Sequence, residues 1–326
     1  MRRLLQRSAS VFRLTRVTGA FAAVANVWFV IVWTRAVPAE PGTAELTNQP
    51  LWASLAGGAL TALGLYAFGA TLNDVVDAKR DRTLRPDRPL PAERVSVELA
   101  ITLAVGTLLT AVLGSLVLGR DAAVLTSVVA VAITAYNVFG RFVPAVGLPI
   151  LSVIYAGHML VPNAGLVFVW PVLLVLTHAL LIGLASHLLD RRLTRLSARA
   201  LACAISGWGL CASALLWSAS QRSEAGGLWP AWVPAESLWW VAGSIGALLV
   251  MCVRRVVRLH RGPRSAEKIR RYGALWPAFY ACAWLIGTGR LDAAWPLIGL
   301  AVAGLLGMTI LREAYALVEE PIEYRS

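Results

Sequence analysis

Apolar runs of about twenty residues recur along almost the whole chain, and this repetition constrains the fold more than any other feature. A helix needs about 20 apolar residues to cross a hydrocarbon core of roughly 30 Å. The sequence is 58% hydrophobic with a mean hydropathy of +0.66, whereas soluble domains are about 45–50% apolar. We therefore predict an all-α, polytopic membrane helical bundle.

The spacing of these runs predicts nine or ten transmembrane helices around a central cavity, with residues 1–326 forming a single domain. The last two spans are the least clear, because the ninth is short and only the turn "GTGRLD" separates it from the tenth. The predicted spans are 17–37, 51–75, 96–118, 121–138, 145–161, 167–189, 199–219, 237–257, 274–288 and 293–311.

Basic residues fall on alternate sides of these spans. With a cytoplasmic N-terminus, 26 of the 30 Lys and Arg lie in cytoplasmic segments; the exceptions are Arg35, Arg120, Arg222 and Arg290. The Lys/Arg bias of loops sets membrane orientation. It therefore predicts a cytoplasmic N-terminus. We expect a protein of the bacterial inner membrane, with the central cavity of the bundle open to the cytoplasm. The same loops explain the net charge of +12 without nucleic acid. We expect the most basic of them, 254–271, to be a solvated loop near anionic membrane lipids.

The stretch "TLNDVVDAKRD" places three carboxylates at the end of the second span. Asp74, Asp77 and Asp81 are three and four residues apart, so on a helix they form one stripe. Asn73 precedes Asp77 by four residues and shares its face. Carboxylates crowded on one face repel unless a cation neutralises them, and hard oxygen ligands without His or Cys suit Mg²⁺. The spacing indicates a Mg²⁺ site.

A basic segment follows the carboxylates directly, with cations at Lys79, Arg80, Arg82, Arg85 and Arg88. Metal-binding carboxylates next to guanidinium groups are suited to holding a diphosphate. The alternative is a solvated helix end in which Asp and Arg pair with one another. The regular spacing and the preceding asparagine favour the diphosphate site.

The sequence "NDVVDAKRD", followed by "RPDRPLP", resembles the first aspartate-rich motif of the UbiA superfamily of intramembrane prenyltransferases. The resemblance implies that Asp74, Asp77 and Asp81 bind Mg²⁺ and act in catalysis. It also implies that four neighbours bind the diphosphate of a polyprenyl donor: Asn73, Lys79, Arg85 and Arg88. A weaker match, "TAYNVFGR" at 134–141, implies that Tyr136 and Arg141 contact the same diphosphate.

The second aspartate-rich motif of the family is eroded here. The corresponding stretch, "SHLLDRRLTR" at 186–195, keeps one carboxylate, Asp190, which the resemblance marks as a catalytic metal ligand. His187 replaces an aspartate and is either a divergent ligand or phosphate donor, or a polar residue at a helix end. Two interpretations remain open. Arg191 and the arginines after it replace part of the metal's charge, or the chain keeps the fold and one half of the site and has lost or changed the reaction.

The resemblance implies Mg²⁺-dependent transfer of a polyprenyl group from its diphosphate to an aromatic or hydroxyl acceptor in the membrane. The eroded motif keeps an alternative open: a catalytically divergent UbiA-like protein that binds or transports a lipid or metabolite, as for members encoded in ebo clusters. An ion-coupled carrier has less support, since the paired broken helices of transporter repeats are missing.

Four further polar residues fall inside or at the ends of the spans, namely Asn26, His158, Asn163 and His178. Polar side chains in membrane helices commonly hydrogen-bond across helices. We expect that role for all four, although Asn26 could instead face the central cavity.

Overall fold

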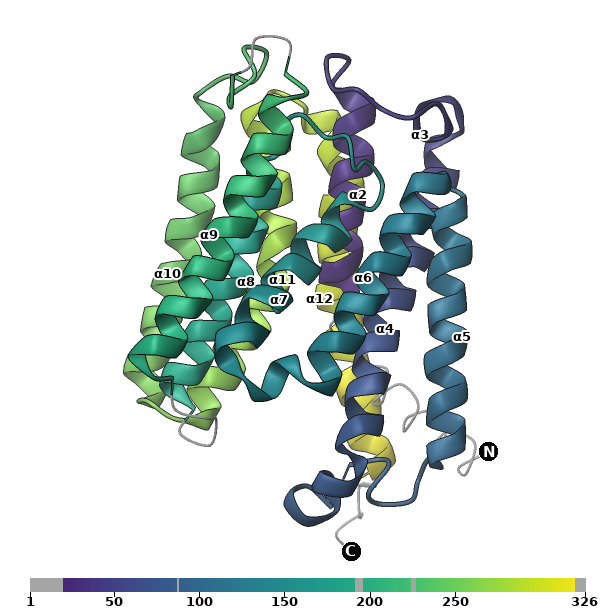
Figure 1. Ribbon diagram of the computed structural model, residues 1–326, viewed down its shortest axis with the longest axis vertical. Coiled ribbons are helices and arrows are strands. Elements are labelled where there is room, and N and C mark those ends of the chain that lie inside the picture. The colour runs from purple at the N-terminus through teal and green to yellow at the C-terminus, as the bar shows by residue number, and fades with distance from the viewer. Residues whose placement is uncertain (1–19, 87, 191–195, 224–226, 320–326) are drawn as a thin grey trace, which may run out of the picture.

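The computed structural model describes residues 20–86, 88–190, 196–223 and 227–319. The described part is helical and contains no strand. Its long helices run roughly along the longest axis of the molecule (Figure 1). They are α2 (Ala20–Ala36), α4 (Leu51–Leu84), α5 (Val97–Leu116), α6 (Arg120–Val138), α7 (Pro144–Leu160), α8 (Trp170–Leu189), α9 (Ala198–Ser220), α10 (Ser237–Leu259), α11 (Pro263–Gly287) and α12 (Leu291–Glu319). Two short elements join them, α3 (Ala44–Asn48) and the 3₁₀ turn η2 (Gly140–Phe142).

Six helices are long and apolar enough to cross a membrane by length and composition: α4, α5, α6, α8, α9 and α10. The helices α2 and α7 and the first part of α12 are shorter but also apolar. The protein is thus an integral membrane helical bundle, as the hydropathy pattern predicts. The count of nine or ten spans stays a prediction.

Three helix boundaries differ clearly from the sequence-based prediction, and one of them is the end of α12, which lies at Glu319 where residue 311 was predicted. The helix α4 continues to Leu84, nine residues past the predicted span end, so the aspartate-rich motif is itself helical. The helix α11 begins at Pro263, so the segment 254–271 is helical apart from a turn at 260–262, and its prediction as a loop is wrong. Proline favours the first helical position, and Arg and Lys are good helix formers.

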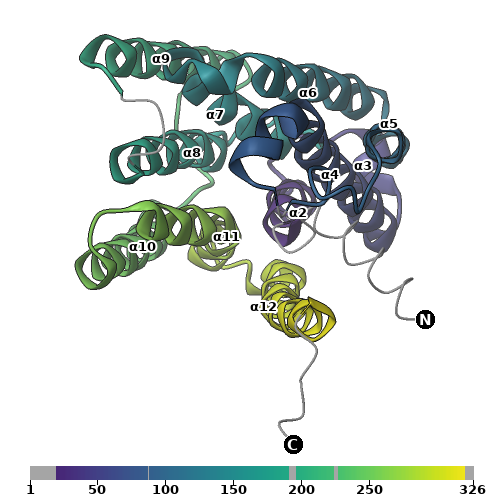
Figure 2. The same cartoon turned by 90° about the horizontal axis from the view of Figure 1, so that it is seen from below.

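The helix α2 lies inside the bundle and packs against α4, α7, α11 and α12 (Figure 2). Most of its side chains are buried. Near its C-terminus, Phe29 and Trp33 join Phe168 and Trp284 in a cluster of rings whose centroids lie 5.1–5.5 Å apart. This aromatic cluster fills the bundle at one end, away from the end of α4.

Small residues let α4 and α5 pack closely. A Cβ atom at Gly64 would lie 2.6 Å from the backbone of Thr107 and Ala111, and one at Gly114 would lie 2.8 Å from the Thr61 nitrogen. Small residues at helix contacts are the usual way for membrane helices to approach. The contact fixes α4, the helix that carries the aspartates.

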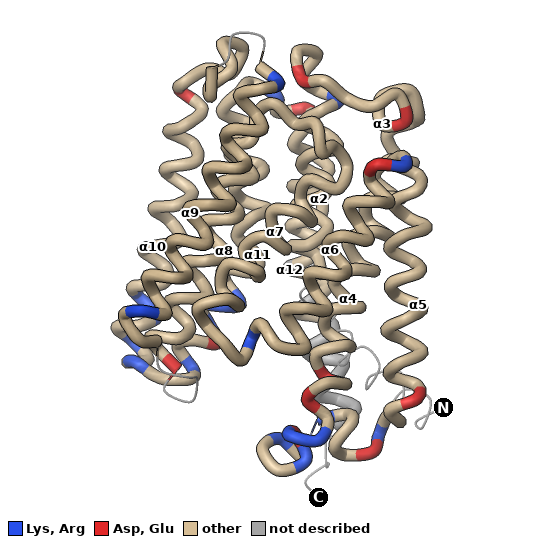
Figure 3. Tube along the Cα trace, viewed as in Figure 1, with Lys and Arg blue, Asp and Glu red and all other residues tan. Residues whose placement is uncertain are grey.

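Lys and Arg concentrate at the end of the bundle where α4, α8 and α10 terminate, which we call the motif end (Figure 3). At 1.5 Å per residue, the 34 residues of α4 extend about 50 Å, well beyond a ~30 Å hydrocarbon core. The last turns of α4 therefore project past the apolar layer, which lowers the cost of their charges.

Candidate functional site

The aspartate-rich motif occupies the last turns of α4. Asp74 and Asp81 are seven residues apart, two helical turns, and therefore share a face of the helix. Both are almost completely buried, with 6% and 4% of their surface exposed. Asn73 and Asp77 are one turn apart on a neighbouring face. Buried carboxylates need a cationic partner, and two arginines supply it.

Arg88 pairs with the first of these faces. The chain turns back after α4, where the Arg88 backbone nitrogen donates to the Arg85 carbonyl at 3.1 Å. This turn brings Arg88 Nη1 to 2.6 Å from Asp81 Oδ2 and 3.3 Å from Asp74 Oδ1. One guanidinium group thus bridges two carboxylates of the motif.

Arg141 pairs with the second face, from the turn between α6 and α7. Gly147 lets this turn fold tightly, since a Cβ there would collide with the backbone oxygen of Gly140. Arg141 Nη1 and Nη2 donate to the two oxygens of Asp77 at 2.9 and 2.7 Å. Nη1 also donates to Asn73 Oδ1 at 2.5 Å. This fork-to-fork geometry is the strong form of the Arg–carboxylate pair.

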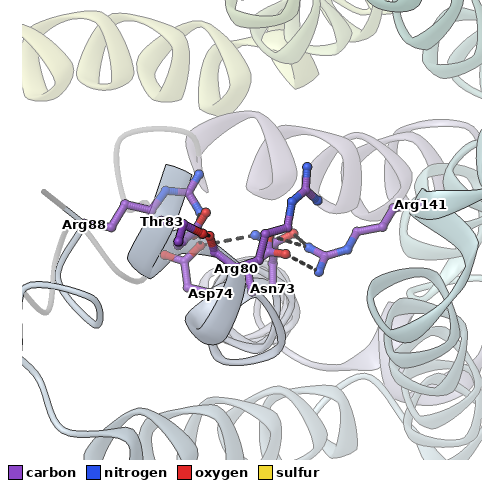
Figure 4. A network of polar contacts seen from close by, with 8 residues as sticks. Asn73, Asp74, Arg80, Thr83, Arg88 and Arg141 are labelled. Atoms are coloured by element: carbon purple, nitrogen blue, oxygen red, sulfur yellow. Dashed lines mark hydrogen bonds and ion pairs between the residues drawn. The ribbon is translucent and has the colours of Figure 1, made fainter. Parts of the chain in front are cut away.

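A further hydrogen bond joins the Arg88 pair to the Arg141 pair, because Asn73 Nδ2 donates to Asp74 Oδ1 at 3.2 Å. Figure 4 shows Arg88 and Arg141 approaching the end of α4 from opposite sides, with Asn73 and Asp74 between them. The pairing of Asp with Arg that the sequence left as an alternative is therefore present. It is not merely local, because Arg141 comes from a segment 64 residues away from Asp77.

The motif fits a Mg²⁺ site that water and substrate phosphates complete better than one formed by protein ligands alone. No group of three or more His, Cys, Asp or Glu in the described part of the chain forms a ready metal site. Asp74 and Asp81, however, lie close enough to share one nitrogen of Arg88. Mg²⁺ is usually bound by one or two carboxylates, with water and substrate phosphates completing its shell. Oxygen donors at this spacing suit that arrangement.

A cavity of about 310 Å³ begins beside the motif and runs into the bundle. Asn73 and Tyr136 line it near the motif. Its walls combine apolar side chains with further polar ones, and carry no charged residue among those described. The other polar residues of the lining are Asn26, Tyr66, Asn137, Tyr155 and His158.

The second motif is at the end of α8. Asp190 caps this helix and is buried, and Arg270 Nη2 of α11 lies 3.9 Å from Asp190 Oδ2. His187 is partly buried in the last turn of the same helix. Arg191 and the arginines and threonine after it lie outside the described residues. Asp190 therefore stands next to a cation, as the first-motif carboxylates do.

The remaining predicted residues fall into two groups, those exposed at the surface and those that form hydrogen bonds inside the bundle. Lys79 and Arg85 are exposed at the surface of the motif end and are not drawn into the Asp–Arg network. The expected hydrogen bonds between segments form at His178, whose ring contacts the Tyr280 hydroxyl at 3.2 Å and the Gly273 oxygen at 2.8 Å. Asn163 likewise donates to Thr34 and Pro41.

Sequence reasoning missed two features of the site. It assigned Arg141 to the diphosphate without foreseeing its pair with Asp77, and it did not select Tyr66 or Tyr155 as cavity residues. The available signal was the run of polar residues inside apolar spans, which mark a pathway or site in membranes.

The sequence pattern of the UbiA prenyltransferase family matches residues 27–282, and the chain belongs to this family. No curated protein sequence matches the chain significantly. Two solved structures are similar to it. One comes from a study of structural and mechanistic insights into the biosynthesis of digeranylgeranylglyceryl phosphate synthase in membranes. It is 16% identical to this chain, with a TM-score of 0.52, and the match covers 88% of this chain and 99% of that one. The other is a UbiA homolog from Archaeoglobus fulgidus bound to GPP and Mg²⁺, 13% identical, with a TM-score of 0.45, over 94% and 99%.

Proposed function

We propose that the protein transfers a polyprenyl group from a polyprenyl diphosphate to an aromatic or hydroxyl acceptor within the membrane, with Mg²⁺ as cofactor. Membership of the prenyltransferase family supports the reaction class. The observation that carries the proposal is the Asp–Arg network at the mouth of the cavity, where Arg88 and Arg141 hold Asp74, Asp77 and Asp81.

Each partner in this network has a separate role. Asp74 and Asp81 would hold Mg²⁺, which supplies Lewis-acid stabilisation of the departing diphosphate. Arg88 and Arg141 present guanidinium donors that match phosphate oxygens in pairs. As these arginines turn toward the diphosphate, the carboxylates they leave become free for the cation, so substrate and metal are expected to bind together.

The cavity walls protect the reacting carbon. Breaking the allylic C–O bond leaves a carbocation that water would capture, and apolar walls exclude water. The rings of Tyr66 and Tyr136 line the cavity, and the face of an aromatic ring stabilises a nearby cation. The acceptor then bonds to the allylic carbon and loses a proton.

We place the motif end on the cytoplasmic face of a bacterial inner membrane. Lys and Arg gather at that end (Figure 3), as the bias of cytoplasmic loops predicts. The charged head group of a polyprenyl diphosphate would then reach the Asp–Arg network directly from the cytoplasm.

One observation favours a second candidate function. The second motif retains a single carboxylate, Asp190, and this carboxylate already faces Arg270. A protein with one complete half-site could bind a prenyl diphosphate or another lipid without transferring it, which is the divergent binding or transport role.

Pyrophosphate release separates these candidates. Purified wild type and the Asp74→Asn and Asp77→Asn variants are each incubated with Mg²⁺, labelled farnesyl or geranylgeranyl diphosphate, and a membrane lipid extract as the source of acceptor. Asp121→Asn is the matched control, because Asp121 is an exposed carboxylate at the opposite end of the bundle. We expect release that needs Mg²⁺ and falls at least about 100-fold in both motif variants, in line with the loss of a group that stabilises transition-state charge.

Saturable donor binding without release in the wild type would contradict the transferase and support the binding role. Release that survives both motif substitutions would place the chemistry elsewhere.

A further inference from the structure

The last turns of α10 present apolar and basic side chains on one exposed side of the helix, which we call the outer face of α10. It consists of Val250, Val253, Arg254, Val257 and Arg258. The three valines are 58–68% exposed, and both arginines are exposed. At 3.6 residues per turn, these positions fall within about 140° of one another. The buried residues Val241 and Leu248 lie on the opposite side of the helix.

The two arginines lie where lipid head groups are expected. The helix α10 is long and apolar enough to cross a membrane, and it lies at the outer edge of the bundle, packed against α11 (Figure 2). Near its other end Trp240 is 56% exposed, as expected of an aromatic side chain at a membrane interface. Arg258 follows Trp240 by eighteen residues, about 27 Å along the helix axis, close to the ~30 Å of a hydrocarbon core. Val250 and Val253, which come before the arginines, therefore face acyl chains.

The chain does not neutralise these two cations. Among the described residues, neither Arg254 nor Arg258 forms an ion pair, and Glu267 is the only acidic residue in α10 and α11. Arg88 and Arg141, by contrast, are both paired with aspartates. Side chains four residues apart on a helix have Cβ atoms about 5–6 Å apart, where like charges repel. An anion bound between the two guanidinium groups would turn this repulsion into attraction.

The two arginines belong to a helical hairpin that is held in place, and not to a free loop. In the turn between α10 and α11, the Ser265 hydroxyl donates to the His260 carbonyl. The guanidinium group of Arg255 lies over the Tyr272 ring, 5.5 Å from its centre, and joins the two helices. Val256 packs against a buried cluster that connects α11 to α8. The spacing of the two outward arginines is therefore set by an anchored helix.

A phospholipid fits this combination of groups. Its phosphate oxygens match guanidinium donors, and its acyl chains match the exposed valines. The charge restricts the head group further. A zwitterionic lipid brings an ammonium group that the arginines would repel, whereas an anionic lipid brings negative charge alone, which attracts each Lys or Arg near the membrane surface. The outer face of α10 is also separate from the cavity, whose lining includes no residue of α10 among those described.

We propose that the outer face of α10 binds an anionic phospholipid from the leaflet at the motif end. Arg254 and Arg258 hold its phosphate between them, and Val250 and Val253 contact its acyl chains. This site is distinct from the site of prenyl transfer, and the proposal does not depend on that reaction.

Photo-crosslinking locates the bound lipid. The purified protein is reconstituted in phosphatidylcholine vesicles that contain a small fraction of photoreactive lipid, either phosphatidylglycerol or phosphatidylcholine with the same acyl chains. Mass spectrometry then measures the crosslink yield on peptides of α10. We expect the yield with phosphatidylglycerol to be about 25-fold higher, since each guanidinium group contributes about fivefold.

Arg254→Gln and Arg258→Gln should each reduce this preference about fivefold, and the double variant should abolish it. Glutamine is a good helix former, so the exposed helix is kept, and the single variants cover the case in which the double variant does not fold. Arg199→Gln is the matched control, because Arg199 is an exposed arginine in the first turn of α9, at the same end of the bundle. It should leave the preference on α10 unchanged.

Equal yields from the two lipids in the wild type would overturn the proposal, and so would a preference for phosphatidylglycerol that persists in the double variant. Soluble glycerol 3-phosphate separates a lipid site from a site for free phosphate. If it removes the crosslinks at the same concentration as unlabelled phosphatidylglycerol does, the ligand is a soluble anion and not a lipid.

Discussion

Arg141 holds Asp77 with both terminal nitrogens, at 2.9 and 2.7 Å, and the two side chains are only 12% and 13% exposed. Arg141, which we propose donates hydrogen bonds to the diphosphate, and Asp77, a proposed metal ligand, thus neutralise each other. The same holds for Arg88 with Asp74 and Asp81. Because Arg141 engages both oxygens of Asp77, we expect Mg²⁺ binding at Asp77 to compete with this pair.

Arg141→Gln is expected to change metal binding and turnover in opposite directions. Losing the guanidinium removes a phosphate donor, so kcat/KM for pyrophosphate release should fall about 100-fold. It also frees Asp77, so Mn²⁺ binding without diphosphate, followed by electron paramagnetic resonance, should tighten severalfold. Arg141→Lys should be intermediate, because a point charge does not replace a planar fork.

Weaker Mn²⁺ binding in Arg141→Gln would show that the arginine supports the cation site and does not compete for it.

His187→Asp tests whether the second motif can be rebuilt. His187 and Asp190 are three residues apart at the end of α8, so the substitution places two carboxylates about one turn apart. We expect the Mg²⁺ concentration for half-maximal pyrophosphate release to fall severalfold. His187→Asn, similar in size and without charge, should not produce this gain, and an unchanged Mg²⁺ requirement in His187→Asp would remove residue 187 from the metal site.

Hydropathy predicted the spans well, because a membrane leaves helices as the only way to satisfy the backbone and each helix must be apolar. Most observed boundaries lie within a few residues of the predicted ones. The exceptions are the start of α11 and the ends of α4 and α12. The helix α11 begins with two basic turns, and hydropathy cannot detect a polar helical turn. Nor does the Lys79–Leu84 region look like a span, yet α4 continues through it.

The site was predicted only where it is local in sequence. The positions of Asn73, Asp74, Asp77 and Asp81 follow from their spacing on one helix. The Arg141–Asp77 pair depends on how the turn between α6 and α7 meets α4, and the spacing of residues along one chain does not contain that relationship. The cavity lining likewise draws on α2, α4, α6, α7 and α11 at once.

The close contact of α4 with α5 should be sensitive to a single methyl group. A Cβ at Gly64 would lie 2.6 Å from backbone atoms of Thr107 and Ala111, which cannot move aside easily. Gly64→Ala should therefore destabilise the protein by about 1–3 kcal/mol, the usual cost of overpacking. Gly106→Ala on α5 is the control, with no atom within 4 Å of the added carbon.

Unfolding in mixed micelles measures both variants. Gly106→Ala should be neutral or stabilise by up to about 1 kcal/mol, since alanine is the better helix former. Equal stability of the two variants would show that α4 and α5 separate readily.

Glu40 should make the stability of the end opposite the motif depend on pH. It lies in the connection between α2 and α3, 3% exposed, and accepts bonds from Val167 N at 2.5 Å and from Phe168 N and Trp33 Nε1 at 3.2 Å. Burial raises the pKa of this carboxyl above its usual 4.5, and the hydrogen bonds and the charge of Arg222 oppose the rise only in part.

A raised pKa in the folded state favours the protonated form. The stabilisation is therefore complete below the unfolded pKa and is lost as pH rises through the folded pKa. The melting temperature of the wild type relative to Glu40→Gln should decrease as pH is raised from about 4 toward neutrality, because glutamine does not titrate. Glu45→Gln, an exposed carboxylate on α3, should track the wild type across this range.

Glu40→Ala leaves three buried or partly buried donors without an acceptor, so it should destabilise the protein at every pH, by about 2–5 kcal/mol. If the difference between wild type and Glu40→Gln stays constant from acidic to neutral pH, the pKa of Glu40 is the same in the folded and unfolded states. Its hydrogen bonds and Arg222 would then cancel the cost of burial, contrary to the order inferred from its position.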